Sequence, residues 1–310
     1  MKDEKIATRE AYSKTLIKLG KKHQNIVSLE ADLGGSTQSA KFGAEFPDRY
    51  FNMGIAEQDM FSAAAGMATC GKIPFVSTFA MFAAGRPYDQ VRNSICYPRL
   101  NVKICASHAG ITAEENGPTH QMIEDFSLMR TLPNMTVCST ADFTSTAWLV
   151  EEILKIDGPV YFRISKIPIP LIYDENQKFE IGKGIQFGDG RDATVIATGV
   201  MLAEALQAKE ILEKKGIDIR VIDIHTIKPI DRKIIIKAAK ETKKLITIED
   251  HNIIGGLGSA VCEVVSEEYP TKVVRMGIND QFGKSGNMRA LMEYFHLTAK
   301  DIAKTVREIL

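Results

Sequence analysis

The sequence lacks a pattern of paired cysteines. Five cysteines are spread over 310 residues without a C-x-x-C pair: Cys70, Cys96, Cys105, Cys138 and Cys262. Several of them lie in apolar, strand-like runs, which is typical of reduced and buried thiols. We therefore expect neither a disulfide nor a zinc site.

Net charge and long apolar runs are also absent. Lys+Arg 39 balance Asp+Glu 39, so bulk electrostatics do not favour nucleic acid or a membrane surface as a partner. No run approaches the ~20 apolar residues of a membrane span, and the first residues lead into no apolar core of signal-peptide length. We expect a cytoplasmic protein that binds neither nucleic acid nor membrane.

The composition that remains is that of a globular protein, and its length suggests two domains. In the first half, strand-like runs alternate with helical ones, at residues 26–30, 50–53, 74–79, 102–107, 135–138 and 160–164. This alternation predicts an α/β fold built on a doubly wound parallel sheet.

A second, smaller α/β unit is predicted after a break rich in proline and glycine. Residues 168–190 contain Pro168, Pro170 and four spaced glycines, which indicates a linker. Beyond it we expect strands at 193–197, 218–222, 245–248 and 272–276, and a helix over 201–215. The predicted division is a first domain over 1–167, a linker over 168–190 and a second domain over 191–310.

One carboxylate lies where an extended segment becomes a helix. Residues 49–53 indicate a strand and residues 60–70 an Ala- and Met-rich helix, which places Glu57 in the first helical turn. A glutamate there can simply complement the helix dipole, for a few tenths to about 1 kcal/mol. Because the helix has almost no polar face, we expect it to be buried and Glu57 to be desolvated, which favours a functional role.

Other residues share one position relative to the predicted strands. They lie at or just beyond the C-terminal ends, the edge at which open α/β sheets bind ligands: Asp32, Ser36, Glu57, Phe79, His108 and Arg163. Each alone has an ordinary structural explanation in a turn or a core. Their common position predicts a site.

Two further segments carry candidate functional residues. The loop 108–121 is long, rich in glycine and proline, and contains His108 and His120; such loops are often functional. A metal site is the alternative, but neither histidine has a close partner at ligand spacing. Near the start, Thr8 is the expected N-cap of a helix, so Arg9 falls in the first turn, where a bound anion would offset its conflict with the dipole.

The residues Gly54-Ile-Ala-Glu57-Gln58 resemble the signature of the transketolase family in its pyrimidine-binding domain, and similarity extends along almost the whole chain. In that family the glutamate hydrogen-bonds the aminopyrimidine of thiamine diphosphate and promotes its imino form. The resemblance implies a catalytic and cofactor-binding role for Glu57. It also implies an aromatic wall of Phe79 and Phe82, with Tyr88 in place of an aromatic missing at Gly85. We add Asp32 to the cofactor-binding set.

The segment Asn116-Gly-Pro-Thr-His120 resembles a second motif of the family, Asp-Gly-Pro-Thr-His. The resemblance implies that His120 is catalytic, contacting substrate oxygens and relaying protons. Asn116 replaces an acid that contacts a donor-sugar hydroxyl. Four positions match those that grip the sugar phosphate: Arg9, Ser36, His108 and a basic residue after the strand 160–164. That residue is Lys166 by gapless pairing, or the nearby Arg163, and lysine would keep the charge without the bidentate fork.

The family's diphosphate-binding motif, Gly-Asp-Gly followed by asparagine, has no match. Residues 188–190 read Gly-Asp-Gly but lead straight into a strand, and the next asparagine is Asn252. The resemblance thus implies a split transketolase, of which this chain is the C-terminal subunit with the pyrimidine-binding and C-terminal domains. The implied cofactors are thiamine diphosphate and Mg²⁺ or Ca²⁺, with the diphosphate and the metal held by a separate N-terminal subunit. The implied assembly is a heterotetramer built on a homodimer, and the implied substrates are phosphorylated sugars.

Two other functions are compatible with this sequence. The β-subunit of a 2-oxo-acid dehydrogenase's decarboxylase component has the same two-domain plan and glutamate, although Asn116, His120 and the phosphate-binding set favour transfer. A non-catalytic α/β ligand-binding protein is the alternative of another class, because a fold does not determine a function.

Overall fold

A seven-stranded sheet forms the first unit of the computed structural model, which describes residues 4–310. Its spatial order is β12-β6-β7-β5-β4-β2-β3, and all neighbours are parallel except β12 and β6. The strands are β2 (Ile26–Glu30), β3 (Tyr50–Asn52), β4 (Ile73–Phe79), β5 (Lys103–Ser107), β6 (Thr136–Ser139), β7 (Val160–Ile164) and β12 (Thr226–Lys228). The predicted doubly wound parallel sheet is confirmed.

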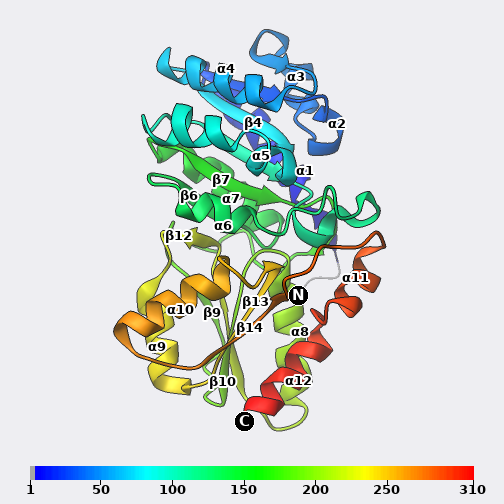
Figure 1. The fold of residues 1–310 in the computed structure, drawn as a ribbon, viewed down its shortest axis with the longest axis vertical. Helices are drawn as coiled ribbons and strands as arrows, with labels where there is room; N and C mark the ends of the chain where they lie inside the picture. Colours follow the sequence, from blue (N-terminus) through cyan, green and yellow to red (C-terminus); the bar gives the residue numbers. More distant parts are fainter. Residues whose placement is uncertain (1–3) are drawn as a thin grey trace.

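Helices cover both faces of this sheet (Figure 1) and create two separate cores. Side chains alternate along a strand, so Phe75 and Val76 on β4 enter opposite cores. One core is shared with α1 (Thr8–Lys22), α3 (Ala40–Glu45) and α7 (Phe143–Glu152). The other is shared with α4 (Glu57–Thr69), α5 (Ala80–Ala84), the π-helical η2 (Gln90–Cys96) and α6 (Asp125–Thr131).

The second unit is a five-stranded sheet with helices on both faces. Its order is β14-β13-β10-β11-β9, formed by β9 (Ile185–Phe187), β10 (Ala193–Ala197), β11 (Ile219–Asp223), β13 (Leu245–Asn252) and β14 (Val273–Ile278). The helices are α8 (Met201–Glu213), α9 (Arg232–Thr242), α10 (Leu257–Glu268), α11 (Met288–Tyr294) and α12 (Ala299–Ile309). This confirms the smaller α/β unit that the sequence predicts.

The stretch expected to be a linker is shared between the two units. Within it, β8 (Pro168–Pro170) pairs antiparallel with β1 (Lys5–Ala7), and β9 adds an edge strand to the second sheet. Prolines are tolerated in β8 because it belongs to a two-stranded ribbon and not to the interior of a sheet. Conversely, β12 follows the second unit's strand β11 in the chain but pairs with β6 at the edge of the first sheet.

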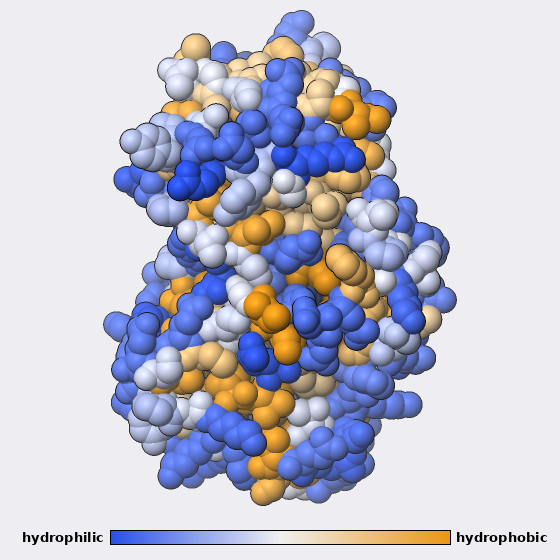
Figure 2. Space-filling model, in the orientation of Figure 1, coloured by the Kyte–Doolittle hydropathy of each residue, from blue (hydrophilic) through white to orange (hydrophobic). Residues whose placement is uncertain are grey.

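Helix α4 differs from its expected burial. Its inner face is buried through Met60, Phe61 and Ala64, but Ser62 and Gly66 are exposed. Small apolar side chains on the outer face led to the expectation of a helix buried on all sides, although no segment of residues 4–310 covers that face. Figure 2 shows a largely hydrophilic surface with hydrophobic patches near the junction of the two units and on the face of the lower unit. No helix within residues 4–310 is long and apolar enough to cross a membrane.

A buried ion pair lies where the two units meet. Arg163 on β7 donates to Asp125 on α6 through Nε, at 2.8 Å from Oδ2, and through Nη2. Its Nη1 donates to the main-chain oxygen of Asp250 on β13 at 2.8 Å, and its guanidinium lies over the Phe126 ring, 3.8 Å from the centroid. Burial alone would raise the pKa of Asp125, but the charge and hydrogen bonds of Arg163 lower it.

We predict that Arg163→Met destabilises the protein by about 3–5 kcal/mol, because it leaves the Asp125 charge buried and unpaired. The free energy of unfolding in urea is the measurement, followed by the fluorescence of Trp148, which packs on Phe179 and on His225 of the second unit. Arg232→Met is the matched control, since it breaks only exposed ion pairs. Equal effects of both substitutions would show that the junction does not depend on this pair.

Candidate functional site

Glu57 is the first residue of α4, as the sequence predicts, and its side chain is 4% exposed. Its Oε1 accepts a hydrogen bond from Arg86 Nη1 at 2.9 Å. The turn before α4 is held by Asn52, whose Oδ1 accepts from Gly54 N at 2.9 Å and from Asp32 N at 3.3 Å. Gly54 has a φ of 68°, which glycine adopts without steric cost. The carboxylate is therefore fixed at the mouth of the helix.

An aromatic group lies beside this region of the sheet edge. Phe79 ends β4 and stacks on Phe82 of α5, with the ring centroids 5.9 Å apart and the planes 13° apart. His108 stacks on Phe79 at 4.0 Å, and the edge of His120 meets Phe82 at 5.2 Å. The structure thus brings together four of the residues that the sequence predicts.

Arg86 is a member of this group to which the sequence analysis assigned no role. Its guanidinium lies over the Phe82 ring, 4.0 Å from the centroid, while it donates to Glu57. A cation four residues after an aromatic in a helical run is the signal that could have found it. Arg86 joins the aromatic wall to the buried carboxylate.

Basic side chains gather at the other end of the site. Arg9, in the first turn of α1, donates through Nη1 to Ser36 O at 2.9 Å, and its buried Nε has no partner among the described residues. Lys166 Nζ lies 3.1 Å from Glu114 Oε2. Burial, with a smaller contribution from the charges of Lys166, Arg9 and His120, lowers the pKa of His108 to about 3. Arg9 and Lys166 thus lie near enough to His108 for their charges to act on it, and a group of basic side chains suits an anion.

Thr8 does not cap α1. Its Oγ1 instead accepts from Ser165 N at 2.7 Å, while the N-cap position is taken by Ala7, which makes no side-chain cap. The prediction was wrong because a threonine before a helix can equally well bind a distant strand end. Arg9 still lies in the first turn, so the rationale for a bound anion is unchanged.

The remaining candidates lie apart from this group or have other partners. Asp32 and Asn116 are exposed. Tyr88 packs against the core of the first unit, with Oη 3.4 Å from Thr131 Oγ1, outside the stacked group. Arg163 is fully engaged by Asp125 and Asp250. We therefore drop Arg163 from the phosphate-binding set and keep Lys166, whose charge acts on His108.

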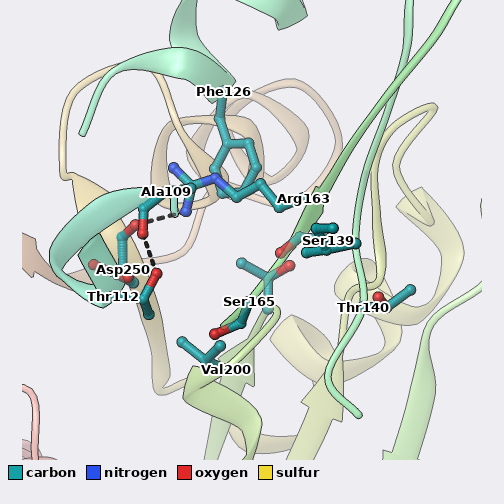
Figure 3. A pocket seen from close by; sticks show the side chains of 11 residues that line it. Ala109, Thr112, Phe126, Ser139, Thr140, Arg163, Ser165, Val200 and Asp250 are labelled. Carbon is teal, nitrogen blue, oxygen red and sulfur yellow. Dashed lines mark hydrogen bonds between the residues drawn. The ribbon is translucent and has the colours of Figure 1, made fainter. Parts of the chain in front are cut away.

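A small cavity lies between the two units at the ends of their strands, lined by both polar and apolar side chains (Figure 3). Asp250 on β13 points to the start of the loop 108–121, where its Oδ1 accepts from Ile111 N at 2.9 Å. Burial raises the pKa of Asp250 to about 6, and the nearby Arg163 charge opposes that rise. Within residues 4–310, no group of three or more His, Cys, Asp or Glu side chains could hold a metal ion.

Both units match domains of known proteins. Residues 4–170 match the transketolase pyrimidine-binding domain, and residues 182–302 match the transketolase C-terminal domain. A solved structure described as a split gene transketolase, an inactive beta4 tetramer, is 50% identical and superposes with a TM-score of 0.89, covering 98% of this chain and 97% of that chain.

Two sequence relatives agree with this match. One is the 6-deoxy-6-sulfo-D-fructose transketolase subunit SqwH of Clostridium sp. (strain MSTE9), 42% identical over 97% of this chain and 94% of that protein. The other is human transketolase, 39% identical over 99% of this chain but only 49% of that protein. Fold and site thus define a pyrimidine-binding domain joined to a C-terminal domain. The chain belongs to the transketolase family, as the resemblance of its motifs implied.

We predict that His108 stays neutral throughout the physiological pH range. Its pKa in the folded chain is lowered to about 3, from an ordinary value of 6.5. The contribution of neutral His108 to the stability of the fold is therefore fully present above the pKa of His108 in the unfolded chain. It is lost as the pH falls toward the pKa of His108 in the folded chain. Ring signals of His108 in NMR spectra should not titrate between about pH 5 and 8. Lys166→Gln should raise the pKa of His108; an unchanged pKa would mean that Lys166 does not face the site.

Proposed function

We propose that this chain is the C-terminal subunit of a split transketolase, which uses thiamine diphosphate to transfer two-carbon ketol units between phosphorylated sugars. The observation that carries the proposal is the position of Glu57. A buried carboxylate begins a helix beside an aromatic wall, and a set of basic groups lies across the same sheet edge. A carboxylate with this placement suits a nitrogenous ring, and the basic groups suit a sugar phosphate.

The residues present fit the aminopyrimidine of thiamine diphosphate. Arg86 shows what the site accepts, because its planar N–H-bearing guanidinium lies over Phe82 while it donates to Glu57. A flat ring with an exocyclic amino group could make the same two contacts, stacking on Phe82 and donating a hydrogen bond to Glu57. Glu57, Phe79 and Phe82 would hold the pyrimidine, with Asp32 at the neighbouring strand end. When bound, the cofactor supplies the nucleophilic carbon and the electron sink that amino-acid side chains lack.

The roles of the other residues follow from their chemistry. Glu57 holds a proton at a ring nitrogen of the bound pyrimidine. His120, at the edge of Phe82, moves a proton at a substrate hydroxyl, and Asn116 contacts a hydroxyl of the donor sugar through its amide. Arg9, Ser36, His108 and Lys166 bind the terminal phosphate by charge-assisted and neutral hydrogen bonds.

The diphosphate end requires a second chain in this proposal. A diphosphate needs a metal ion or a cluster of cations and backbone donors. The Gly-Asp-Gly run of this chain, residues 188–190, is instead part of an edge turn, in which Asp189 accepts from Gln186 at 2.9 Å. We propose that a separate N-terminal subunit holds diphosphate with Mg²⁺ or Ca²⁺, in a symmetric heterotetramer. The exposed outer face of α4 and the exposed Ile55 support contact between copies.

The 50% identical split gene transketolase supports this division, since it is described as an inactive beta4 tetramer. The family assignment also favours ketol transfer over the decarboxylase β-subunit. The relative from Clostridium is named for a sulfonated sugar, so a terminal anion, and not one particular sugar, is the feature that we expect the basic groups to recognise.

A titration tests the proposed function. Purified chain is assayed for ketol transfer with thiamine diphosphate and Mg²⁺ or Ca²⁺, first alone and then with increasing amounts of the N-terminal subunit. We expect no turnover alone and a rise that saturates at an equal ratio of the two chains. Full activity of the isolated chain would refute the division of the site between two subunits.

We predict that Glu57→Gln lowers turnover of the assembled enzyme by about 10²-fold or more, because an amide cannot promote the imino form of the pyrimidine. The matched control is Asp59→Asn, an exposed carboxylate in the same first turn of α4. Both substitutions remove one charge from the helix N-terminus, so Asp59→Asn controls for the loss of that charge, although only Glu57→Gln also weakens the hydrogen bond to Arg86. If Asp59→Asn impairs turnover as much as Glu57→Gln, the effect is on the helix and not on the cofactor.

A further inference from the structure

The loop that carries Asn116 and His120 is held from outside the first unit. It contains a short 3₁₀ segment, η3 (Gly110–Asn116), and it follows β5. In Figure 1 the segment between β14 and α11 runs beside this loop. Gln121 Nε2 donates to Lys284 O at 2.7 Å, and Ser285 Oγ donates to Glu115 O at 2.7 Å. Two hydrogen bonds thus tie the loop to residues 282–288 of the second unit.

Glu114 strengthens this connection from the loop side. Its Oε1 accepts from Met288 N at 3.1 Å, and its Oε2 lies 3.1 Å from Lys166 Nζ. Its φ is 53°, a conformation that a residue with a side chain adopts only when its surroundings enforce it. Gln121 Nε2 also donates to Glu114 O at 3.0 Å, so one amide group bonds both the loop and the second unit.

Gly283 makes the contact possible. A Cβ added there would lie 1.7 Å from Gln121 Oε1, whereas one added at Gly286 would lie 3.5 Å from Leu291. Gly283 has no positive φ, so its glycine is required by the close approach of Gln121 and not by backbone conformation. An added methyl group would therefore clash at Gly283 but fit at Gly286.

We propose that residues 282–288 are a latch by which the C-terminal domain positions the loop of Asn116 and His120 for substrate. The proposal rests on the proposed function of that loop. Gln121, Glu114 and Ser285 are positioning residues in it, since they act through His120 and Lys166. Small displacements of such groups are costly, because reacting atoms must be aligned within fractions of an ångström. The C-terminal domain, which holds none of the candidate site residues, thereby acts on the site.

Hydrogen exchange of the full chain without cofactor or partner tests the latch directly. In Gly283→Ala, backbone amides of residues 110–121 should exchange on the order of ten-fold faster, while those of β5 keep their rates. Gly286→Ala should leave the loop at the wild-type rate. Ser285→Ala loses one exposed hydrogen bond and creates no clash, so it should give a smaller increase in the exchange rates of the loop. It replaces Gly283→Ala in the test if that variant does not fold. Loop rates that are alike in both glycine variants would overturn the latch.

Kinetics with the N-terminal subunit complete the test. Gly283→Ala should lower kcat/KM for the donor sugar by about ten- to hundred-fold, with the affinity for thiamine diphosphate unchanged. A loosened loop with unchanged kcat/KM would overturn the positioning role. If the wild-type pair shows no ketol transfer at all, the proposed function fails, and the exchange rates alone then decide whether the latch exists.

Discussion

The buried pair of Arg163 and Asp125 is the interaction on which the rest of the structure depends. A guanidinium removed from water must be matched by a carboxylate and by further acceptors, and here one acceptor, Asp250 O, belongs to the second unit. The pair therefore fixes β7, α6 and β13 relative to one another. Because these elements bring the C-terminal edges of both sheets together, the loop after β5 is enclosed between two units.

The candidate site depends on this enclosure. Glu57, Phe79 and His108 come from three successive strand-end connections of the first sheet, and that sheet alone is enough to bring them together. His120 and Lys166 are different, because the loop that carries His120 is bonded to the second unit, and so is Glu114, the carboxylate of that loop that pairs with Lys166. The group around Glu57 and Phe79 is thus built within one domain, whereas the group around His120 and Lys166 depends on both.

Much of this could be predicted from local sequence. The strands alternate with helices at recognisable periods, and Glu57 falls in the first turn of α4 because apolar runs define both neighbouring elements. The errors share one cause. Thr8 bonds Ser165 instead of capping α1, and the outer face of α4 is exposed, since neither the partner of a hydroxyl nor the number of helix faces covered is encoded in a short window.

The sequence by itself determined the fold class, the two α/β units and most of the residues gathered at the first sheet's edge, because strand ends and helix starts depend on neighbours within a few turns of chain. Only the tertiary structure decided that Arg163 supports the junction while Lys166 pairs with Glu114, that Arg86 reaches Glu57, and that Gly283 admits Gln121. These contacts join residues far apart in sequence, and which distant groups meet is fixed by packing alone.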